Sequence, residues 1–324
     1  MRALVTGGAG FLGSHLVDRL RADGFDVVVL DDLSTGRVEN LAAHRGDPRV
    51  TLATVDVRDR PRVAREVERA DVVFHLAGAV GVRRGAEDPA GTWSRNVEGT
   101  ASVLEACARG GTRCLLASTS EAYGPTAAGT LCEDHPVVLD PAGRRDVYGV
   151  SKVAGESLAL ALHRTLLLPV TVVRPFNVVG PRQSARYGMV LPRFAASAVR
   201  GEPLTVHGDG RQTRTFLHVA DAVDALLLLA ATPACEGLLV NVGSDEEVEI
   251  ADLARLVVAV AGTGSPLRFV PFADVYGPGF TDPLTRRPDL SLLRRLTGFA
   301  PRLRLADAVS DAVRSAREAM AAPV

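Results

Sequence analysis

Two short segments of the sequence carry side chains suited to moving a proton and a hydride. Residues 118–121 read Ser-Thr-Ser-Glu after an apolar run, and Tyr148 and Lys152 stand four residues apart in a stretch with helical character. Residues four apart share one face of a helix, and an ammonium beside a phenol favours the phenolate, which lowers a phenol pKa of about 10. We therefore expect Tyr148 to take the proton of a hydroxyl group while a hydride leaves the same carbon atom, with Ser118 or Thr119 hydrogen-bonded to that oxygen.

The residues able to hold a hydride acceptor lie near the start of the chain. Gly7, Gly10 and Gly13 follow apolar residues 3–5, and residues 15–20 have the pattern of a helix. In such a strand–turn–helix unit the first glycine permits the tight turn, the second lets a pyrophosphate approach the backbone, and the third lets the helix pack against the strand. The next predicted strand ends in Asp31, whose carboxylate can bind both ribose hydroxyls and repels a 2′-phosphate. The spacing therefore predicts an NAD site rather than an NADP site.

Other residues at predicted strand ends complete this cofactor site. Asp56 follows the third strand, where it either contacts the adenine amine or caps the next helix. Residues 75–78, His-Leu-Ala-Gly, end the fourth strand; the small residues let the backbone lie against the cofactor, whereas we expect His75 to be a structural core residue. The predicted cofactor-binding residues are Gly7, Gly10, Phe11, Leu12, Gly13, Asp31, Asp32, Asp56, Val57, Leu76, Ala77, Gly78, Tyr148 and Lys152.

Short apolar strands alternate with helical stretches through the first half of the chain. We expect strands at 4–6, 27–30, 50–55, 72–76, 114–118 and 170–173, and helices at 62–68, 96–108 and 150–167. Continuous Val/Leu runs indicate strands covered on both faces, which is typical of a parallel sheet. The sequence predicts an α/β fold, with a Rossmann-type, doubly wound parallel sheet in residues 1–180 and a smaller α/β substrate-binding lobe in 181–324. Residues 217–242 could return from that lobe to the first domain.

Composition excludes several classes of function. The net charge of −1 provides no basic field for nucleic acid, and no apolar run approaches the roughly 20 residues of a membrane span. Met1-Arg2 leads straight into a predicted core strand, so we expect no signal peptide and a cytoplasmic protein. The four cysteines are scattered, with no C-x-x-C pair and no clustering of histidines, so we expect reduced thiols and no metal site.

Six segments together resemble the extended short-chain dehydrogenase/reductases, a family that acts on nucleotide sugars. They are residues 6–13, 75–78, 118–124, 148–152, 174–181 and 208–219, and the resemblance runs from residue 3 to past residue 310. It implies a Rossmann domain, a sugar-nucleotide lobe and a tightly held NAD that is reduced and reoxidised within a cycle. It also implies a homodimer packed through the helices near residues 96–109 and 150–163.

Three reactions of this family begin with oxidation at C4 of the sugar. A 4-epimerase returns the hydride to the other face of the sugar. A 4,6-dehydratase usually carries Asp-Glu after its Ser-Thr. A uronate decarboxylase needs only the 4-ketone, because a carboxylate β to a carbonyl readily loses CO₂. Ser120-Glu121 lacks the dehydratase Asp and resembles the UDP-glucuronate decarboxylases (UDP-xylose synthases), as do residues 212–214 and 281–290. Residues 81–85 depart from the Pro-rich segment of the eukaryotic type.

The resemblance therefore implies decarboxylation of UDP-glucuronate to a UDP-4-keto-pentose or UDP-xylose. The alternatives are a nucleotide-sugar 4-epimerase, then a 4,6-dehydratase, and, from a different class, a non-catalytic NAD-binding protein. The predicted catalytic residues are Tyr148, Lys152, Ser118, Thr119, Ser120, Glu121 and Arg214, the last where the subfamily places its catalytic arginine.

The nucleotide sugar is expected to lie against a set of polar residues spread over the second half of the chain. The predicted substrate-binding residues are Arg83, Asn177, Thr205, His207, Gln212, Arg214 and Arg286. Because a uronate and Glu121 repel each other, we expect Glu121 to be protonated or paired with Arg83, Arg84 or Arg214. Four other arginines are expected to be solvated surface residues: Arg193, Arg287, Arg294 and Arg295.

Overall fold

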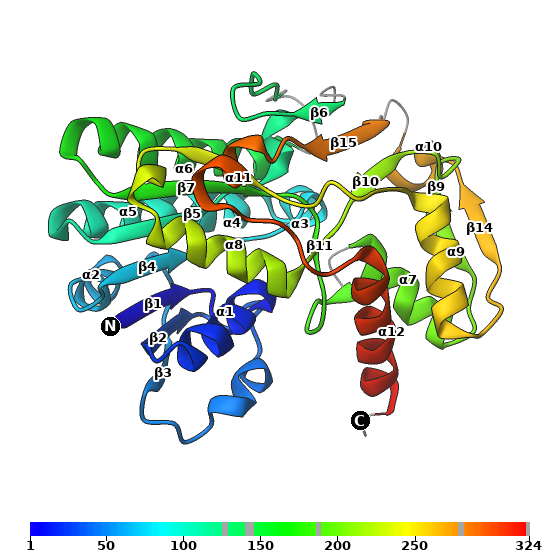
Figure 1. Ribbon diagram of the computed structural model, residues 1–324, viewed down its shortest axis with the longest axis horizontal. Helices are drawn as coiled ribbons and strands as arrows, with labels where there is room; N and C mark the ends of the chain where they lie inside the picture. Colours follow the sequence, from blue (N-terminus) through cyan, green and yellow to red (C-terminus); the bar gives the residue numbers. More distant parts are fainter. Residues whose placement is uncertain (125–128, 140–145, 186–188, 278–281, 322–324) are drawn as a thin grey trace.

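A seven-stranded parallel sheet brings the predicted motifs to one edge (Figure 1). The computed structural model describes residues 1–124, 129–139, 146–185, 189–277 and 282–321, with the backbone alone at 82–84 and 146. The strand order is β12-β7-β5-β4-β1-β2-β3, and every neighbouring pair is parallel. The strands are β1 (Arg2–Thr6), β2 (Asp26–Asp31), β3 (Val50–Thr54), β4 (Val72–His75), β5 (Arg113–Ala117), β7 (Val170–Pro175) and β12 (Leu239–Val242).

Helices cover both faces of this sheet. Adjacent residues of β1 enter different cores, because Val5 packs with helix residues such as Leu16 and Leu226, whereas Leu4 packs with Val63 and Leu104. This double burial explains the continuous apolar runs in the sequence. The doubly wound α/β fold predicted from the sequence is confirmed.

The helices predicted in the first half of the chain are present with their bounds shifted by up to four residues, whereas α3 and α4 were not predicted. The helices are α1 (Phe11–Ala22), α2 (Arg60–Val67), α3 (Val82–Glu87), α4 (Pro89–Trp93), α5 (Gly99–Gly110), α6 (Asp146–Leu166), α7 (Val190–Val199), α8 (Val219–Ala231), α9 (Ile250–Ala261), α10 (Phe272–Tyr276), α11 (Ser291–Thr297) and α12 (Leu305–Ala321). Shorter turns are 3₁₀ segments at Val38–His44, Ser120–Tyr123 and Pro233–Cys235 and a π segment at Ser94–Glu98. Within the described ranges, no helix combines the length and apolarity needed to cross a membrane.

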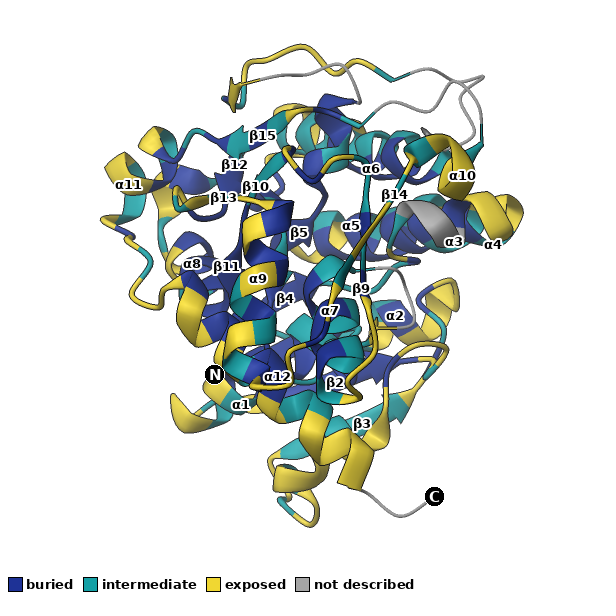
Figure 2. Ribbon diagram, turned by 90° about the vertical axis from the view of Figure 1, so that its right-hand side faces the viewer, coloured by how far each residue is buried: buried dark blue, intermediate teal, exposed yellow. Residues whose placement is uncertain are grey.

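The second half of the chain forms a smaller helical core and also returns to the large sheet. Helices α7, α9 and α12 pack together with the parallel pair β9 (Leu204–His207) and β14 (Leu267–Val270), on the right of Figure 1. Figure 2 shows the central strands buried and the exposed residues on outer faces of helices such as α9. The segment 217–242 supplies α8 and β12, and β12 pairs with β7 at one edge of the large sheet.

A four-stranded sheet joins segments that are far apart in the sequence. It was not predicted from the sequence, and its order is β13-β10-β15-β6, with β13 (Glu247–Glu249), β10 (Thr213–Thr215), β15 (Thr285–Pro288) and β6 (Thr130–Leu131). Its strands β6 and β15 lie at the top of Figure 1. A two-stranded sheet pairs β8 (Val178–Val179) with β11 (Leu217–His218). In the register of β10 and β15, Arg214 is the direct partner of Arg286. Two predicted phosphate-binding arginines are thus neighbours on adjacent strands.

Candidate active site

One continuous cavity of about 2170 Å³ connects the glycine turn to the smaller lobe. Its wall includes the ends of β2, β4 and β5, the start of α6, and residues of α7, β9, β10, β15 and α12. Pockets for a single small ligand usually measure about 300–1,000 Å³. The cavity therefore has room for two extended ligands, such as a dinucleotide and a nucleotide sugar.

The glycine turn has the shape that a pyrophosphate requires. Gly7 has a φ of +72°, and a Cβ there would lie 2.8 Å from the Ala77 nitrogen. A Cβ at Gly13 would lie 2.2 Å from the Gly7 oxygen, so this helix–strand contact admits glycine alone. A Cβ at Gly10, by contrast, would meet only the Gly7 oxygen, at 3.1 Å, and Gly10 lines the cavity at the start of α1. These residues fit NAD, with its phosphates at the helix N-terminus.

Carboxylates lie where the adenosine of such a cofactor is expected. Asp31 is buried and accepts hydrogen bonds from the Ala9 and Leu33 nitrogens, both at 2.9 Å, while burial raises its pKa. Asp32 accepts from the Ser34 nitrogen and hydroxyl. Asp31 is thereby fixed beside the glycine turn, and both carboxylates line the cavity.

Asp56 lines the cavity but caps no helix. It accepts a hydrogen bond from the Arg58 nitrogen at 2.9 Å and pairs with the Arg58 guanidinium at 2.5 Å. Asp59 is the residue that caps α2, because its side chain accepts from the Arg62 nitrogen at 3.2 Å. The helix-cap alternative for Asp56 is therefore wrong. The other predicted cofactor residues that line the cavity are Phe11, Leu12, Val57, Leu76, Ala77 and Gly78.

His75 is a structural residue of the core. Its ring nitrogens lie 2.7 Å from the Thr6 hydroxyl and 3.0 Å from the Thr100 hydroxyl. Burial, and then the charge of Lys152, lower the pKa of His75 to about 3. The imidazole is therefore neutral at physiological pH, with both nitrogens engaged.

Tyr148 and Lys152 both line the cavity from α6, but their electrostatics differ from the expectation. Burial raises the pKa of Tyr148 to about 12; a hydrogen bond from Thr119 partly offsets this, and the charge of Glu121 adds to it. The Lys152 ammonium donates to the Ala117 carbonyl at 2.8 Å, and burial lowers its pKa to about 8. The expected lowering of the pKa of Tyr148 by Lys152 is thus wrong for this structure, because desolvation of the phenol dominates and the ammonium is bound to the backbone.

The two hydroxyl candidates at the end of β5 have different partners. Ser118 donates to Glu156 at 2.5 Å, and Glu156 in turn binds Arg174. Thr119 accepts from the Glu121 nitrogen at 3.2 Å and also hydrogen-bonds to the Tyr148 phenol. The geometry therefore associates Thr119 with the phenol. Ser120 is buried and lines the cavity beside them.

Glu121 pairs with Arg286 at 2.5 Å, a partner that was not among the three arginines predicted from the sequence. The side chains of Arg83 and Arg84 lie outside the described part of the structure. Arg214 pairs with Asp282 at 2.5 Å and donates to the Pro283 carbonyl at 2.9 Å. Since Arg214 and Arg286 are opposite each other in register, each needs its own carboxylate, because like charges placed directly across two strands repel.

At the far end of the cavity, polar residues gather around His207. The Arg193 guanidinium donates to His207 Nε2 at 2.9 Å and to the Thr205 carbonyl at 3.2 Å, and His207 Nδ1 lies 3.0 Å from the Tyr276 hydroxyl. Since Nε2 accepts from Arg193, Nδ1 carries the proton of the neutral ring; burial and the charge of Arg193 lower its pKa to about 4. Arg193 therefore lines the cavity, and its prediction as a solvated surface residue is wrong.

The remaining substrate residues support this region of the cavity. Gln212 donates to the His207 carbonyl at 2.9 Å, and Asn177, with a φ of +38°, donates to the Thr215 carbonyl at 2.8 Å. Both line the cavity, whereas Thr205 lies behind it and contributes its carbonyl to Arg193. Sequence reasoning missed the cavity-lining rings Phe272 and Tyr276, because their helix has five residues and no motif marks it.

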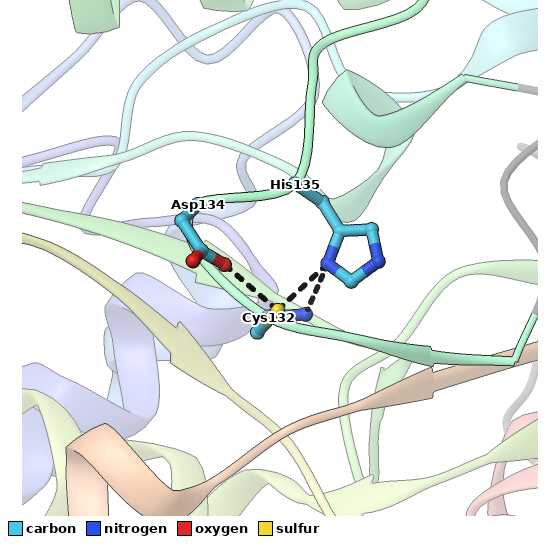
Figure 3. A group of neighbouring side chains, drawn as sticks. All are labelled: Cys132, Asp134 and His135. Atoms are coloured by element: carbon cyan, nitrogen blue, oxygen red, sulfur yellow. Dashed lines mark hydrogen bonds between the residues drawn. The ribbon is translucent and has the colours of Figure 1, made fainter.

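Outside the cavity, Cys132, Asp134 and His135 meet at one turn (Figure 3). The thiol donates to Asp134 at 2.8 Å and lies 2.7 Å from His135 Nδ1, which also accepts from the Cys132 nitrogen at 3.1 Å. The expectation of scattered cysteines without histidine clustering is therefore wrong for Cys132, which contacts His135. Hydrogen-bond contacts of the Cys132 thiol thus link the three side chains.

Known proteins are similar to this chain in both sequence and architecture. The chain is 33% identical over 318 residues to a UDP-N-acetyl-alpha-D-glucosaminuronate decarboxylase of Bacillus cytotoxicus, covering 98% of each. It is 36% identical over 321 residues to UDP-glucuronic acid decarboxylase 4 of Arabidopsis thaliana, covering 98% of this chain and 69% of that one. A UDP-glucuronic acid 4-epimerase from Bacillus cereus, solved in complex with NAD, superposes with a TM-score of 0.85 at 27% identity, covering 98% and 99%.

The glycine turn, the end of β5 and the start of α6 all fall within one matched region. Residues 3–243 match the model of the NAD dependent epimerase/dehydratase family, so this chain belongs to that family.

Proposed function

We propose that the protein is an NAD-dependent decarboxylase of UDP-glucuronate. The observation that carries the proposal is the ion pair of Glu121 and Arg286 in the same cavity as Tyr148. The pair places a carboxylate whose charge is already compensated near the sugar, so that a second carboxylate, on the substrate, can enter without an unpaired neighbour. Two relatives are named as decarboxylases of uronates, which supports the proposed activity.

The first step is oxidation at C4 of the sugar. NAD⁺, when bound by the glycine turn and the carboxylates around Asp31, supplies a hydride acceptor. In its ionised form Tyr148 takes the proton of the C4 hydroxyl and becomes the neutral phenol, and Thr119, which is hydrogen-bonded to the phenol, orients that hydroxyl. Lys152 lies on the same face of α6, where its ammonium donates to the Ala117 carbonyl, and we propose that it stabilises the ionised phenol when cofactor and sugar are bound.

Loss of CO₂ follows from the ketone itself. With a carbonyl at C4, the carboxylate on C5 is a β-keto acid; the C5–C6 bond breaks, CO₂ leaves, and the electron pair passes to the C4 oxygen as an enolate. A proton is then delivered to C5, and we assign its relay to Glu121, which lines the cavity. Return of the hydride to C4 before release gives UDP-xylose; release before that step gives the UDP-4-keto-pentose.

The diphosphate of the nucleotide sugar requires cationic side chains that are held in place. Arg214 and Arg286 are adjacent in register, and both line the cavity. Guanidinium groups are always charged and bind phosphate oxygens with two parallel hydrogen bonds. Asn177 lines the same cavity. At its far end, which suits the base, lie Arg193, His207, Phe272 and Tyr276.

The runner-up is a nucleotide-sugar 4-epimerase, favoured by the architecture shared with the Bacillus cereus epimerase. The purified chain is mixed with NAD⁺ and ¹³C-labelled UDP-glucuronate, and released ¹³CO₂ and product mass are followed. A parallel reaction uses UDP-N-acetylglucosaminuronate, and Tyr148→Phe is the control. Release of ¹³CO₂ with the matching loss of product mass supports the proposal. Unchanged mass with inverted C4 overturns it in favour of epimerisation, and reaction of the N-acetylated sugar alone shows that the substrate is the N-acetylated uronate instead.

A further inference from the structure

Glu156 is a buried carboxylate one helical turn beyond Lys152 that the steps above do not use. Its side chain and that of Arg174 are 5% and 3% exposed, and they form two hydrogen bonds of 2.7 and 2.8 Å. Burying an ion pair costs desolvation that the pairing itself scarcely repays. A purely structural position is therefore served as well by apolar residues, which points to a specific role for these charges.

Further contacts hold this ion pair in place. The Arg174 guanidinium lies 4.5 Å from the centre of the Tyr123 ring, and the Tyr123 hydroxyl donates to Asn241 of β12 at 2.8 Å. The third contact of Glu156 is the Ser118 hydroxyl, at 2.5 Å. Because the Ser118 proton is used in that bond, the Ser118 hydroxyl can only accept hydrogen bonds from groups in the cavity.

The charged and titratable groups around Lys152 come from three elements. Tyr148 and Glu156 share α6 with it, His75 lies on β4, and Arg174 on β7 neutralises the far side of Glu156. Tyr148 and His75 are neutral near pH 7, so Glu156 is the anion among them. Its charge raises the pKa of Lys152 against the burial that lowers it.

We propose that Glu156 is a positioning residue, whose carboxylate fixes the direction of the Ser118 hydroxyl and balances the charge of Lys152. The inference deepens the proposed function, because an ammonium beside Tyr148 is what the oxidation step uses. The loss of that ammonium as the pH rises should therefore set the alkaline limit of activity. Removing Glu156 should move that limit to lower pH.

The composition of the chain makes Lys152 directly observable. Of the 37 lysine and arginine residues, 36 are arginine, and Lys152 is the one lysine. Protein labelled with [ε-¹³C]lysine therefore gives a single lysine resonance, whose chemical shift reports protonation of this ammonium. The titration needs no substrate and no turnover.

The experiment compares the wild type with Glu156→Gln and with Glu133→Gln as a matched control. Glu133 is another partly buried carboxylate at this edge of the sheet, bound to the Asn241 nitrogen at 2.8 Å. We expect the Lys152 midpoint, near pH 8 in the wild type, to fall by about one pH unit in Glu156→Gln and to stay unchanged in Glu133→Gln. Glu156→Asp, which keeps the charge, should give a midpoint between the two.

Two further measurements keep the result decisive. If the unpaired Arg174 prevents folding of Glu156→Gln, the double variant Glu156→Gln/Arg174→Met removes both charges and should still show the lowered midpoint. In active protein, the alkaline limb of kcat should shift with the resonance. An unchanged lysine midpoint in folded variants overturns the inference; a shifted midpoint in a protein inactive on uronates upholds it and overturns the proposed function instead.

Discussion

Replacing Arg286 with methionine tests whether the ion pair with Glu121 has the strength that its burial indicates. The two side chains are 8% and 32% exposed, and the joined atoms, Arg286 Nη1 and Glu121 Oε1, are 2.5 Å apart. Fully exposed pairs contribute about 0.2–1 kcal/mol, whereas breaking a fully buried pair costs about 3–5 kcal/mol. A pair with one buried and one partly exposed member should lie between, so we expect a coupling energy of about 2 kcal/mol.

The assay is a double-mutant cycle on the free energy of unfolding. Urea unfolding of wild type, Glu121→Gln, Arg286→Met and the double variant isolates the pairwise coupling from other effects of each change. Arg287 and Glu247 provide the matched control on the same strand, because their charged atoms are 3.7 Å apart and the side chains are 43% and 30% exposed. That cycle should give no more than about 0.5 kcal/mol. A Glu121–Arg286 coupling no larger than the control would refute the reasoning that this pair is held in a desolvated site.

Three further predictions concern the catalytic face and the glycine turn. In the wild type, the raised pKa of Tyr148 contributes stability that is fully present below about pH 10 and is lost as the pH rises through about 12, a change of roughly 2–3 kcal/mol in the free energy of unfolding. Urea unfolding of Tyr148→Phe should not show this loss. The same variant should still bind NAD but should no longer oxidise C4. Thr119→Val should slow NADH formation from UDP-glucuronate at least tenfold more than Ser118→Ala, and equal rates would contradict the assignment of Thr119. Gly10→Ala should weaken NAD binding, measured by calorimetry, with little change in thermal midpoint, whereas Gly13→Ala should lower the midpoint because its Cβ meets the Gly7 oxygen at 2.2 Å.

The sequence predicted the parts of the molecule whose signals are local. The strands of the large sheet are apolar runs, and the glycine turn and the Tyr148–Lys152 pair are defined by short spacings, so their positions followed directly. The pairing of Glu121 with Arg286 was missed, because it joins residues brought together by a three-residue strand and a four-residue strand of the small sheet. Arg193 was misassigned for the same reason, since only the folded chain brings it to His207.

Burial was the other quantity that sequence reasoning could not supply. A Tyr–Lys pair on one helical face was expected to give an acidic phenol, but the desolvation of Tyr148 raises its pKa instead. The cost of desolvation depends on the surrounding lobes and not on the four-residue spacing. The homodimer implied by the family resemblance stays a prediction.

The small four-stranded sheet has a consequence for how this chain could be divided or recombined. β6, at Thr130–Leu131, hydrogen-bonds to β15, while β12, at Leu239–Val242, completes the edge of the large sheet. A cut near Gly180 would therefore leave each fragment missing a strand that only the other carries. We expect that neither half folds by itself and that exchange of substrate lobes between homologous enzymes requires at least two crossover points rather than one.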